Sequence, residues 1–183
     1  MGTSQGETWA KVSSAVASWV ASNAGQVSVW GGNDIEPGFG SAPAAIDWSK
    51  GFAADSISLY LNYGSADGCP PFGSCNNGWD QYDVWYVSWG SLPAVASPQI
   101  YCSAQGSQWA DLSLYGADDQ SGPIIFQGPL DQYDLDKTDN YTSAGAWDDL
   151  VNDLDGNSST AQTPPYSLEI HDEVTTSVST GEC

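Results

Sequence analysis

Short apolar segments alternate with helical patterns along the chain, and this alternation restricts the fold more than any other feature of the sequence. Strands are expected at residues 26–30, 56–63, 83–89, 98–102, 123–127 and 166–170, which are rich in β-branched and aromatic side chains. Apolar residues recur at helical spacing over residues 9–20, 43–53, 107–116 and 143–154. The pattern predicts an α/β fold, either an open parallel sheet with five or six short strands or a partial (βα)-barrel. A complete barrel normally needs about 200 residues or more.

The N-terminal helix has a start signal of its own. Ser4 and Glu7 have the Ser-x-x-Glu spacing of a capping box. The apolar face that follows is formed by Trp9, Val12, Val16, Trp19 and Val20. The first residues lack the basic and apolar regions of a signal peptide, so Met1 is expected to open a fragment of a longer protein. The 183 residues predict one α/β domain over 1–156, followed by a last strand and a Ser/Thr-rich tail over 157–183.

The charge of the chain excludes two classes of partner. There are 23 acidic and only 3 basic residues, which gives a formal net charge of −20. Nucleic acid is excluded because no basic patch can neutralise phosphates. Membrane binding is excluded as well, because anionic bilayers attract Lys and Arg clusters and no apolar segment is long enough to span one. The 9 Trp, 9 Tyr and 4 Phe side chains supply the apolar surface of a folded core.

Cysteine usage predicts an oxidising compartment and therefore a secreted, extracellular protein. Cys69 and Cys75 enclose a short Pro- and Gly-rich loop that a local disulfide can close. Cys102 and Cys183 either pair with each other or stay free. A zinc site is disfavoured because the cysteine spacing is not Cys-x-x-Cys and His171 is distant in the sequence.

The segment most informative about chemistry is Asn33-Asp34-Ile35-Glu36-Pro37. If the first strand continues to Glu36, Asp34 and Glu36 share one face with their stems about 6–7 Å apart. Like charges this close raise one pKa, so that one acid holds a proton while the other is ionised. Glycoside hydrolysis needs such a pair of carboxyl groups. A surface pair or a helix cap is the other interpretation of the motif.

Other predicted strand ends carry polar and aromatic side chains. These candidate substrate-binding residues are Asn62, Tyr63, Asp67, Trp89, Tyr101 and Gln127. Aromatic faces suit the apolar faces of sugar rings, and amide or carboxylate groups suit their hydroxyls. Trp residues that only fill the core are the competing interpretation.

No metal or cofactor is expected. Oxygen-bearing side chains alternate from Asp134 to Asn140 as in calcium loops, but Asp139 and Gly145 replace the Gly and Glu of an EF-hand. We therefore interpret this segment as an acidic turn. The chain also lacks a P-loop and a Gly-x-Ser-x-Gly elbow, and its single histidine, His171, makes a Ser-His-Asp triad improbable.

Several longer motifs resemble a known group of proteins. They are VSVWGGNDIEPGFG, LNYGSADGCPP, WDQYDVWYVSWGS, PQIYCSAQGSQWADLSLYG and IIFQGPLDQ, within roughly residues 8–135. Together they look like secreted bacterial proteins, mainly actinobacterial, with a glycoside-hydrolase-like barrel domain. More distantly, NDIEP, PQIY and IIFQGPLDQ are similar to the family-25 glycoside hydrolases, the muramidases. The resemblance implies the later part of a barrel, with Glu36 as general acid and Asp34 as its partner.

The expected function is therefore a secreted glycoside-hydrolase-like domain that acts on or binds a polysaccharide such as cell-wall glycan. If active, it would use the acid/base chemistry of Asp34 and Glu36. The alternatives are a non-catalytic carbohydrate-binding protein and a surface or assembly protein. A partial barrel has exposed sheet edges, which predict a homo-oligomer in the assembly case.

Overall fold

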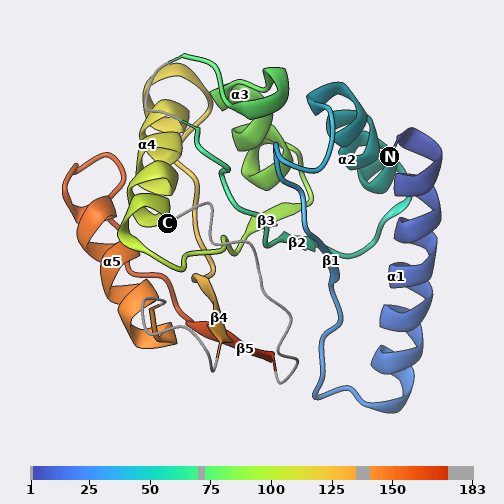
Figure 1. Cartoon of the computed structure of the whole chain (residues 1–183). Helices are drawn as coiled ribbons and strands as arrows, with labels where there is room; N and C mark the ends of the chain where they lie inside the picture. Colours follow the sequence, from blue (N-terminus) through green and yellow to red (C-terminus); the bar gives the residue numbers. More distant parts are fainter. Residues whose placement is uncertain (1, 70–72, 135–140, 173–183) are drawn as a thin grey trace.

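The computed structural model describes residues 2–69, 73–134 and 141–172, and within them five helices alternate with five short strands (Figure 1). The helices are α1 (Thr3–Asn23), α2 (Ala42–Asp55), α3 (Gln81–Trp85), α4 (Ser103–Asp119) and α5 (Ser143–Asp155). The strands are β1 (Gly31–Asn33), β2 (Tyr60–Asn62), β3 (Ala94–Ala96), β4 (Leu130–Asp134) and β5 (Leu168–Asp172). A 3₁₀ turn (Asn76–Gly78) precedes α3, and a π-helical turn (Tyr86–Gly90) follows it.

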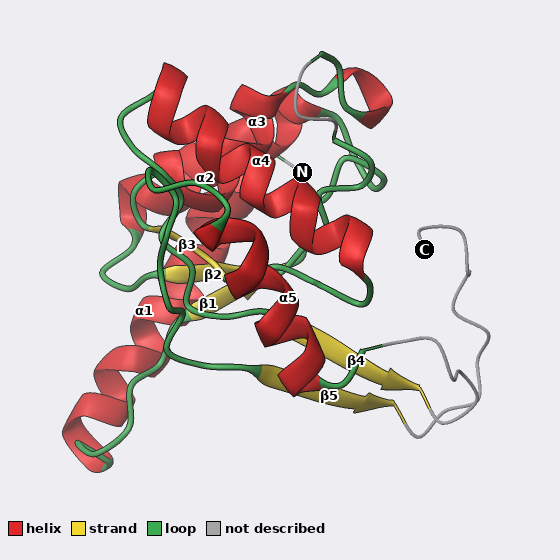
Figure 2. Cartoon of the chain, turned by 90° about the vertical axis from the view of Figure 1, so that its left-hand side faces the viewer, coloured by secondary structure: helices red, strands yellow, loops and turns green. Residues whose placement is uncertain are grey.

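All paired strands are parallel and follow one another in chain order. One sheet has the order β1-β2-β3, and a second contains β4 and β5. An isolated parallel bridge from Gln99 to Leu130 links the segment after β3 to β4, and a second bridge joins Ala96 of β3 to Phe126. In Figure 2 the pair β4 and β5 extends away from the first sheet beneath α5. The predicted α/β fold with parallel strands is confirmed, whereas the described residues form no closed barrel.

Two of the four predicted helices, 43–53 and 143–154, have nearly their predicted bounds, and the other two are longer than predicted. The strand predicted at residues 83–89 is wrong. Residues 83–89 form the end of α3 and the π-helical turn. A capping box causes this: the Asp80 carboxylate accepts from the Asp83 N–H at 3.0 Å, and the Asp83 carboxylate accepts from the Asp80 N–H at 3.0 Å. These bonds satisfy N–H groups at a helix start, so they favour a helix over the strand propensity of the aromatic residues.

The remaining predicted strands differ in position. Residues 26–30 lie outside any strand, and β1 begins directly after them at Gly31. Segments 98–102 and 123–127 contribute only single bridges, at Gln99 and Phe126. β4 was not predicted, because its sequence LDQYD has few β-branched residues. β2 lies within the predicted 56–63, and β5 overlaps the predicted 166–170.

α1 packs through its small residues, which contradicts the predicted apolar face. A Cβ on Gly6 would come within 2.1 Å of the Trp48 carbonyl oxygen of α2, so the two helices approach closely at this glycine. The buried positions of α1 are Gly6, Ala10, Ser13 and Val20. The predicted capping box is also wrong, since the helix begins at Thr3 with Gly2 as its N-cap and no side-chain cap.

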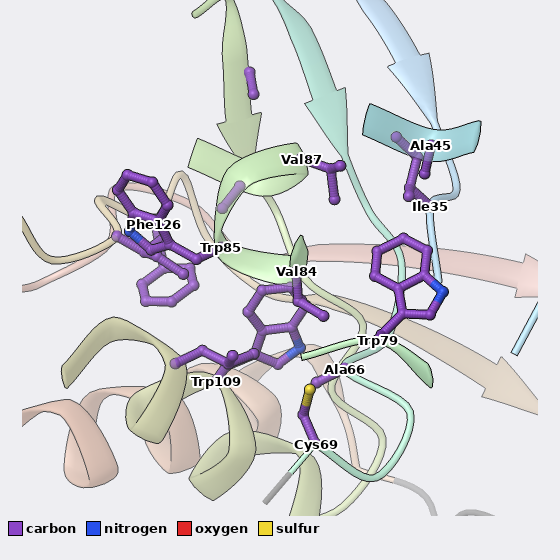
Figure 3. Packing of buried hydrophobic residues seen from close by; sticks show 14 of the residues in the cluster. Ile35, Ala45, Ala66, Cys69, Trp79, Val84, Trp85, Val87, Trp109 and Phe126 are labelled. Atoms are coloured by element: carbon purple, nitrogen blue, oxygen red, sulfur yellow. The ribbon is translucent and has the colours of Figure 1, made fainter. Parts of the chain in front are cut away.

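The core lies between the first sheet and the helices that cover it. Tyr60 of β2 is fully buried and packs edge-on against Trp48 and Phe52 of α2, with ring centroids 5.2 and 5.1 Å apart. Figure 3 shows the cluster extending from Ile35, Ala45 and Trp79 at one end to Trp85, Trp109 and Phe126 at the other. The aromatic content of the sequence therefore does fill a core.

Two features hold the irregular segments to this core. The predicted disulfide between Cys69 and Cys75 is confirmed, and both half-cystines are buried. Whether Cys102 pairs with Cys183, which the sequence left open, involves a residue outside the described part of the chain, Cys183. After α5, the Gln162 side chain accepts from the Phe126 N–H at 2.9 Å and donates to the Ile124 carbonyl at 2.8 Å.

Among the described helices, none has the length and apolar composition needed to cross a lipid bilayer.

Candidate functional site

The predicted carboxyl pair forms at the carboxyl end of the first sheet. β1 ends at Asn33, so Asp34 and Glu36 lie in the following loop and not on a continued strand. Their carboxyl groups nevertheless meet in a side-chain hydrogen bond. The sequence predicted that the two acids would meet because they share one face of a strand. That reason is wrong, because the loop after the strand brings the two groups together. A hydrogen bond between two carboxyl groups requires one shared proton.

Asn62 at the end of β2 fixes the path of this loop. Its Oδ1 accepts hydrogen bonds from the backbone N–H groups of Ile35 (3.0 Å) and Gly64 (3.3 Å). Its Nδ2 donates to the Ser88 Oγ at 2.8 Å. The side chain is 1% exposed, so all of its hydrogen-bonding capacity is directed into the protein. Asn62 thus positions the segment that carries Asp34 and Glu36.

Each carboxyl group has a further partner from a neighbouring segment. The Ser65 N–H donates to Glu36 Oε1 at 3.1 Å, and the Gln99 side chain donates to Asp34 Oδ1 at 3.3 Å. Gly64 allows this approach, because a Cβ there would lie 2.2 Å from the Ile35 carbonyl oxygen and 2.9 Å from Glu36 Cγ. Three loops that follow β1, β2 and β3 therefore converge on the pair.

Burial changes the acidity of the pair. Desolvation raises the pKa of Asp34 above its ordinary value, and the hydrogen bond with Glu36 opposes this increase without cancelling it. Glu36 is 7% exposed, so Asp34 is the more accessible carboxyl group. The arrangement places a half-buried acid, Asp34, in front of a buried one, Glu36.

A cavity of about 240 Å³ lies against Glu36. Its walls come from the 35–41 loop, the start of α2 and Trp79, and they comprise Ile35, Glu36, Phe39, Gly40, Ser41, Ala44, Ala45 and Trp79. Ile35, Ala45 and Trp79 also belong to the buried cluster in Figure 3. The Trp79 indole N–H donates to the Gly40 carbonyl at 2.7 Å and so holds the loop over the cavity. Phe39 is 73% exposed at its rim.

Two predicted binding residues lie near the pair. The Tyr63 ring lies against Gly32 of β1, where a Cβ would be 3.0 Å from Tyr63 Cε1. Asp67 lies beside the loop after Glu36, because a Cβ on Gly38 would be 2.9 Å from Asp67 Oδ2. The Asn76 side chain donates to the Asp67 carboxylate at 3.1 Å and holds it in place.

The other three predicted residues lie outside this constellation. Residues 83–89 do not form a strand, so Trp89 does not lie at a strand end. It belongs to the π-helical turn before β3 and packs against the core. Tyr101 directly precedes the N-cap of α4, and its N–H donates to Gln105 Oε1 at 2.6 Å. The backbone of Gln127 bonds to Ala96 and Tyr166, which places it on the junction of the two sheets.

The sequence did not reveal four further residues of the candidate site, which are Ser65 and Gln99 beside the carboxyl pair and Phe39 and Trp79 at the cavity. Gln99 lay within the predicted strand 98–102, so the sequence did not place it at a strand end, whereas in the structure it follows β3, which ends at Ala96. Phe39 and Trp79 gave no signal either. Both line the cavity, and the Trp79 indole bond to the Gly40 carbonyl joins the segment after the disulfide-bonded loop to the 35–41 segment.

A second group of carboxyl groups lies between α4 and α5. Burial, followed by the negative charge of Asp153, raises the pKa values of both Asp111 and Asp149. A Cβ on Gly106 would be 2.1 Å from Asp149 Oδ2 and 3.1 Å from Asp153 Oδ2, so these acids pack directly on α4. No group of three or more His, Cys, Asp or Glu in the described part of the chain is arranged to hold a metal ion. The segment 135–140 of the predicted acidic turn lies outside the described residues.

Asp153→Asn is expected to stabilise the protein at neutral pH by on the order of 0.5 kcal/mol, because it removes a like charge beside two carboxylates. A carboxyl group whose pKa is raised in the folded state contributes its full share of protein stability below about pH 4, the pKa of the unfolded chain. It loses that contribution as the pH rises through its folded-state pKa. The gain should therefore grow from pH 4 to pH 7 in urea unfolding. Asp148→Asn, an exposed change on the same helix, is the control and should give no such growth.

Comparison of the chain with protein-family models, curated proteins and solved structures finds no significant match.

Proposed function

We propose that the protein acts on polysaccharide, such as cell-wall glycan, through acid/base chemistry of Asp34 and Glu36. The observation that carries this proposal is the direct hydrogen bond between the two carboxyl groups at the carboxyl end of parallel strands. Functional groups gather at this end in parallel α/β proteins. A glycosidic bond is cleaved by one group that protonates the leaving oxygen and a second that supports the developing positive charge.

The environment of each acid supports a division of roles. Asp34 has the raised pKa and the greater exposure, so it can carry a proton to the substrate. Glu36 accepts from the Ser65 N–H, an interaction that stabilises its ionised form. In this proposal Asp34 has the acid role, the reverse of the role implied by the muramidase resemblance.

The cavity supports a sugar as the group that is bound. Its volume of about 240 Å³ is close to that of eight waters, and this suits one sugar ring and not an oligosaccharide. Phe39 and Trp79 provide aromatic surface, and Glu36 provides hydrogen-bond acceptors. Apolar ring faces with few polar anchors are the usual composition of carbohydrate and small-molecule sites.

Asp34→Asn and Glu36→Gln are each expected to lower kcat for hydrolysis of peptidoglycan or another glycan by about 100-fold or more. Reducing-end release by the wild-type protein provides the assay. Activity should fall as the pH rises through the raised pKa of Asp34, because the proton donor is then lost. Asp47→Asn, an exposed change on α2, serves as the control and should keep full activity. Absence of wild-type hydrolysis on every glycan, or unchanged variants, would reject the enzymatic proposal.

A second candidate is non-catalytic carbohydrate binding, which the 73% exposure of Phe39 at the cavity rim favours. In that case glycan binding should survive Glu36→Gln and be lost in Phe39→Ala. Trp89→Ala is unsuitable as the diagnostic change, because Trp89 packs against the core. A secreted location is part of either proposal, and the buried Cys69–Cys75 disulfide supports it.

A further inference from the structure

The wall of the Glu36 cavity is rich in groups that attract positive charge and poor in hydrogen-bond donors. Glu36 is the one charged residue among the described residues that line it. The Ser65 N–H donates to Glu36 Oε1, an interaction that stabilises the ionised carboxylate. The Trp79 indole N–H is already bound to the Gly40 carbonyl, so the indole offers a ligand its ring and no donor. A carboxylate and an indole ring both attract cations.

The start of α2 forms another part of this wall and adds few donors. A helix N-terminus binds anions through its free N–H groups. Here Pro43 has no N–H, and the N–H groups of Ala44 and Ala45 each donate to the Ser41 carbonyl at 3.1 Å. The Ser41 hydroxyl makes no capping bond with the helix, so it is the remaining side-chain donor of the wall. The beginning of α2 therefore does not make the cavity an anion site.

Basic side chains of the protein itself are too scarce to occupy this wall. The chain has only three: Lys11 pairs with Asp55 at 3.1 Å, Lys50 is exposed on α2, and Lys137 lies outside the described residues. Neither Lys11 nor Lys50 lines the cavity. The net charge of −20 also creates a negative potential that attracts cations and repels anions. A ligand with a positive charge is therefore favoured both in the cavity and at long range.

An ammonium group matches this wall better than a hydroxyl does. Each hydroxyl of a sugar ring both donates and accepts, and a buried hydroxyl without partners is costly. An ammonium group has three donors and no acceptor, which suits the carboxylate oxygens of Glu36. The apolar ring face can then lie on Trp79 while the hydroxyls face the rim, where Phe39 is 73% exposed. A sugar ring that carries an amino group therefore uses the wall more completely than a neutral ring.

We propose that the Glu36 cavity selects an amino sugar with a free ammonium group, as in the glucosamine units of a de-N-acetylated glycan. The ammonium binds the Glu36 carboxylate through a charge-assisted hydrogen bond beside the aromatic surface of Trp79 and Phe39. N-acetylation removes the charge and weakens binding, and a uronic acid, which is negatively charged, is repelled. The inference rests on the proposed function, from which it takes the sugar ring, and it adds the charge that the ring carries.

Isothermal titration calorimetry with matched ligands tests the proposal at about pH 6, where amines are protonated. The glucosamine trimer should bind at least about tenfold more tightly than the N-acetylglucosamine trimer, and added NaCl should weaken its binding. The galacturonic acid trimer should not bind. Spermidine has as many amino groups as the glucosamine trimer but no sugar ring, and it should bind at least about tenfold more weakly, because it gains nothing from the ring surface of the wall.

Glu36→Gln should reduce the preference for the charged trimer by at least about fivefold. Asp47→Asn removes the same charge from the exposed face of α2 and should keep the preference, which separates the cavity from the overall field. If circular dichroism shows that Glu36→Gln fails to fold, Ala44→Lys is the second test, because it adds a positive charge to the cavity wall and should lower the preference in the same way.

The outcomes that would overturn the proposal differ from those that would reject hydrolysis. Equal affinity for the two trimers, equal affinity for spermidine, or a preference that Glu36→Gln and Ala44→Lys leave intact would each overturn it. Glycan cleavage by a protein without the preference would retain the proposed function and reject this inference. A preference that depends on Glu36, found in a protein that cleaves no glycan, would retain this inference and reject the acid/base chemistry.

Discussion

Replacing Asn62 with leucine is expected to lower the free energy of unfolding by about 3–5 kcal/mol. Leucine has nearly the same shape, but it removes three hydrogen bonds at a side chain that is 1% exposed. The Ile35 and Gly64 N–H groups would lose their shared acceptor, and each buried, unsatisfied polar group costs about 1–3 kcal/mol. Urea unfolding measured through tryptophan fluorescence gives the change directly.

The same substitution should also release the loop that carries Asp34 and Glu36. The pKa of Asp34 is expected to return toward its ordinary value in this variant, because its carboxyl group becomes more exposed to solvent. NMR titration of the variant and the wild type checks this. Asn152→Leu is the matched control, because Asn152 is exposed on α5 and should change stability by less than about 0.5 kcal/mol. If Asn62→Leu were as stable as the control, Asn62 would not hold the loop.

Trp109→Ala is expected to destabilise the protein by about 3–5 kcal/mol, the usual cost of removing a large aromatic side chain from a core. Trp109 is fully buried on α4 and packs edge-on against Phe126, with ring centroids 6.1 Å apart. Phe126 in turn forms an isolated parallel bridge with Ala96 of β3. Calorimetric melting should therefore show a large decrease in Tm.

Trp109→Phe provides the comparison that separates packing from hydrogen bonding. The Trp109 indole N–H is buried with no hydrogen-bond partner among the described residues, so phenylalanine removes a polar group that contributes no bond. The cost should be only about 1–2 kcal/mol, from the smaller ring. A loss as large as that of Trp109→Ala would show that the indole N–H does make a stabilising bond.

The α1 helix illustrates where sequence periodicity is informative and where it is not. Helical spacing correctly predicted the existence of the helix from Trp9 to Val20. It could not show which face is buried, because the contact with α2 uses a glycine that a hydrophobic pattern ignores. The close approach at Gly6 depends on a backbone in α2, and no local pattern contains that information. The largest apolar side chains were therefore assigned to the wrong environment.

The candidate site shows a similar division. The pairing of Asp34 with Glu36 was predictable from two acids beside a strand end, although the structure achieves it in a loop. The partners of the pair were not predictable, because Ser65 and Gln99 come from loops after two other strands. Trp89 was wrongly placed at a strand end because an Asp-x-x-Asp cap converted its segment to helix. Long-range positions depend on the sheet order, which the sequence predicts only as a class of fold.

The shared use of residues by the core and the cavity has a consequence for protein engineering. Ile35, Ala45 and Trp79 form both the floor of the cavity and part of the buried cluster. Any attempt to reshape the floor for a new ligand would therefore reduce stability at the same time. Phe39 and Ser41 at the rim are exposed and can be varied without that penalty. A library for altered specificity should diversify the rim and leave the floor unchanged.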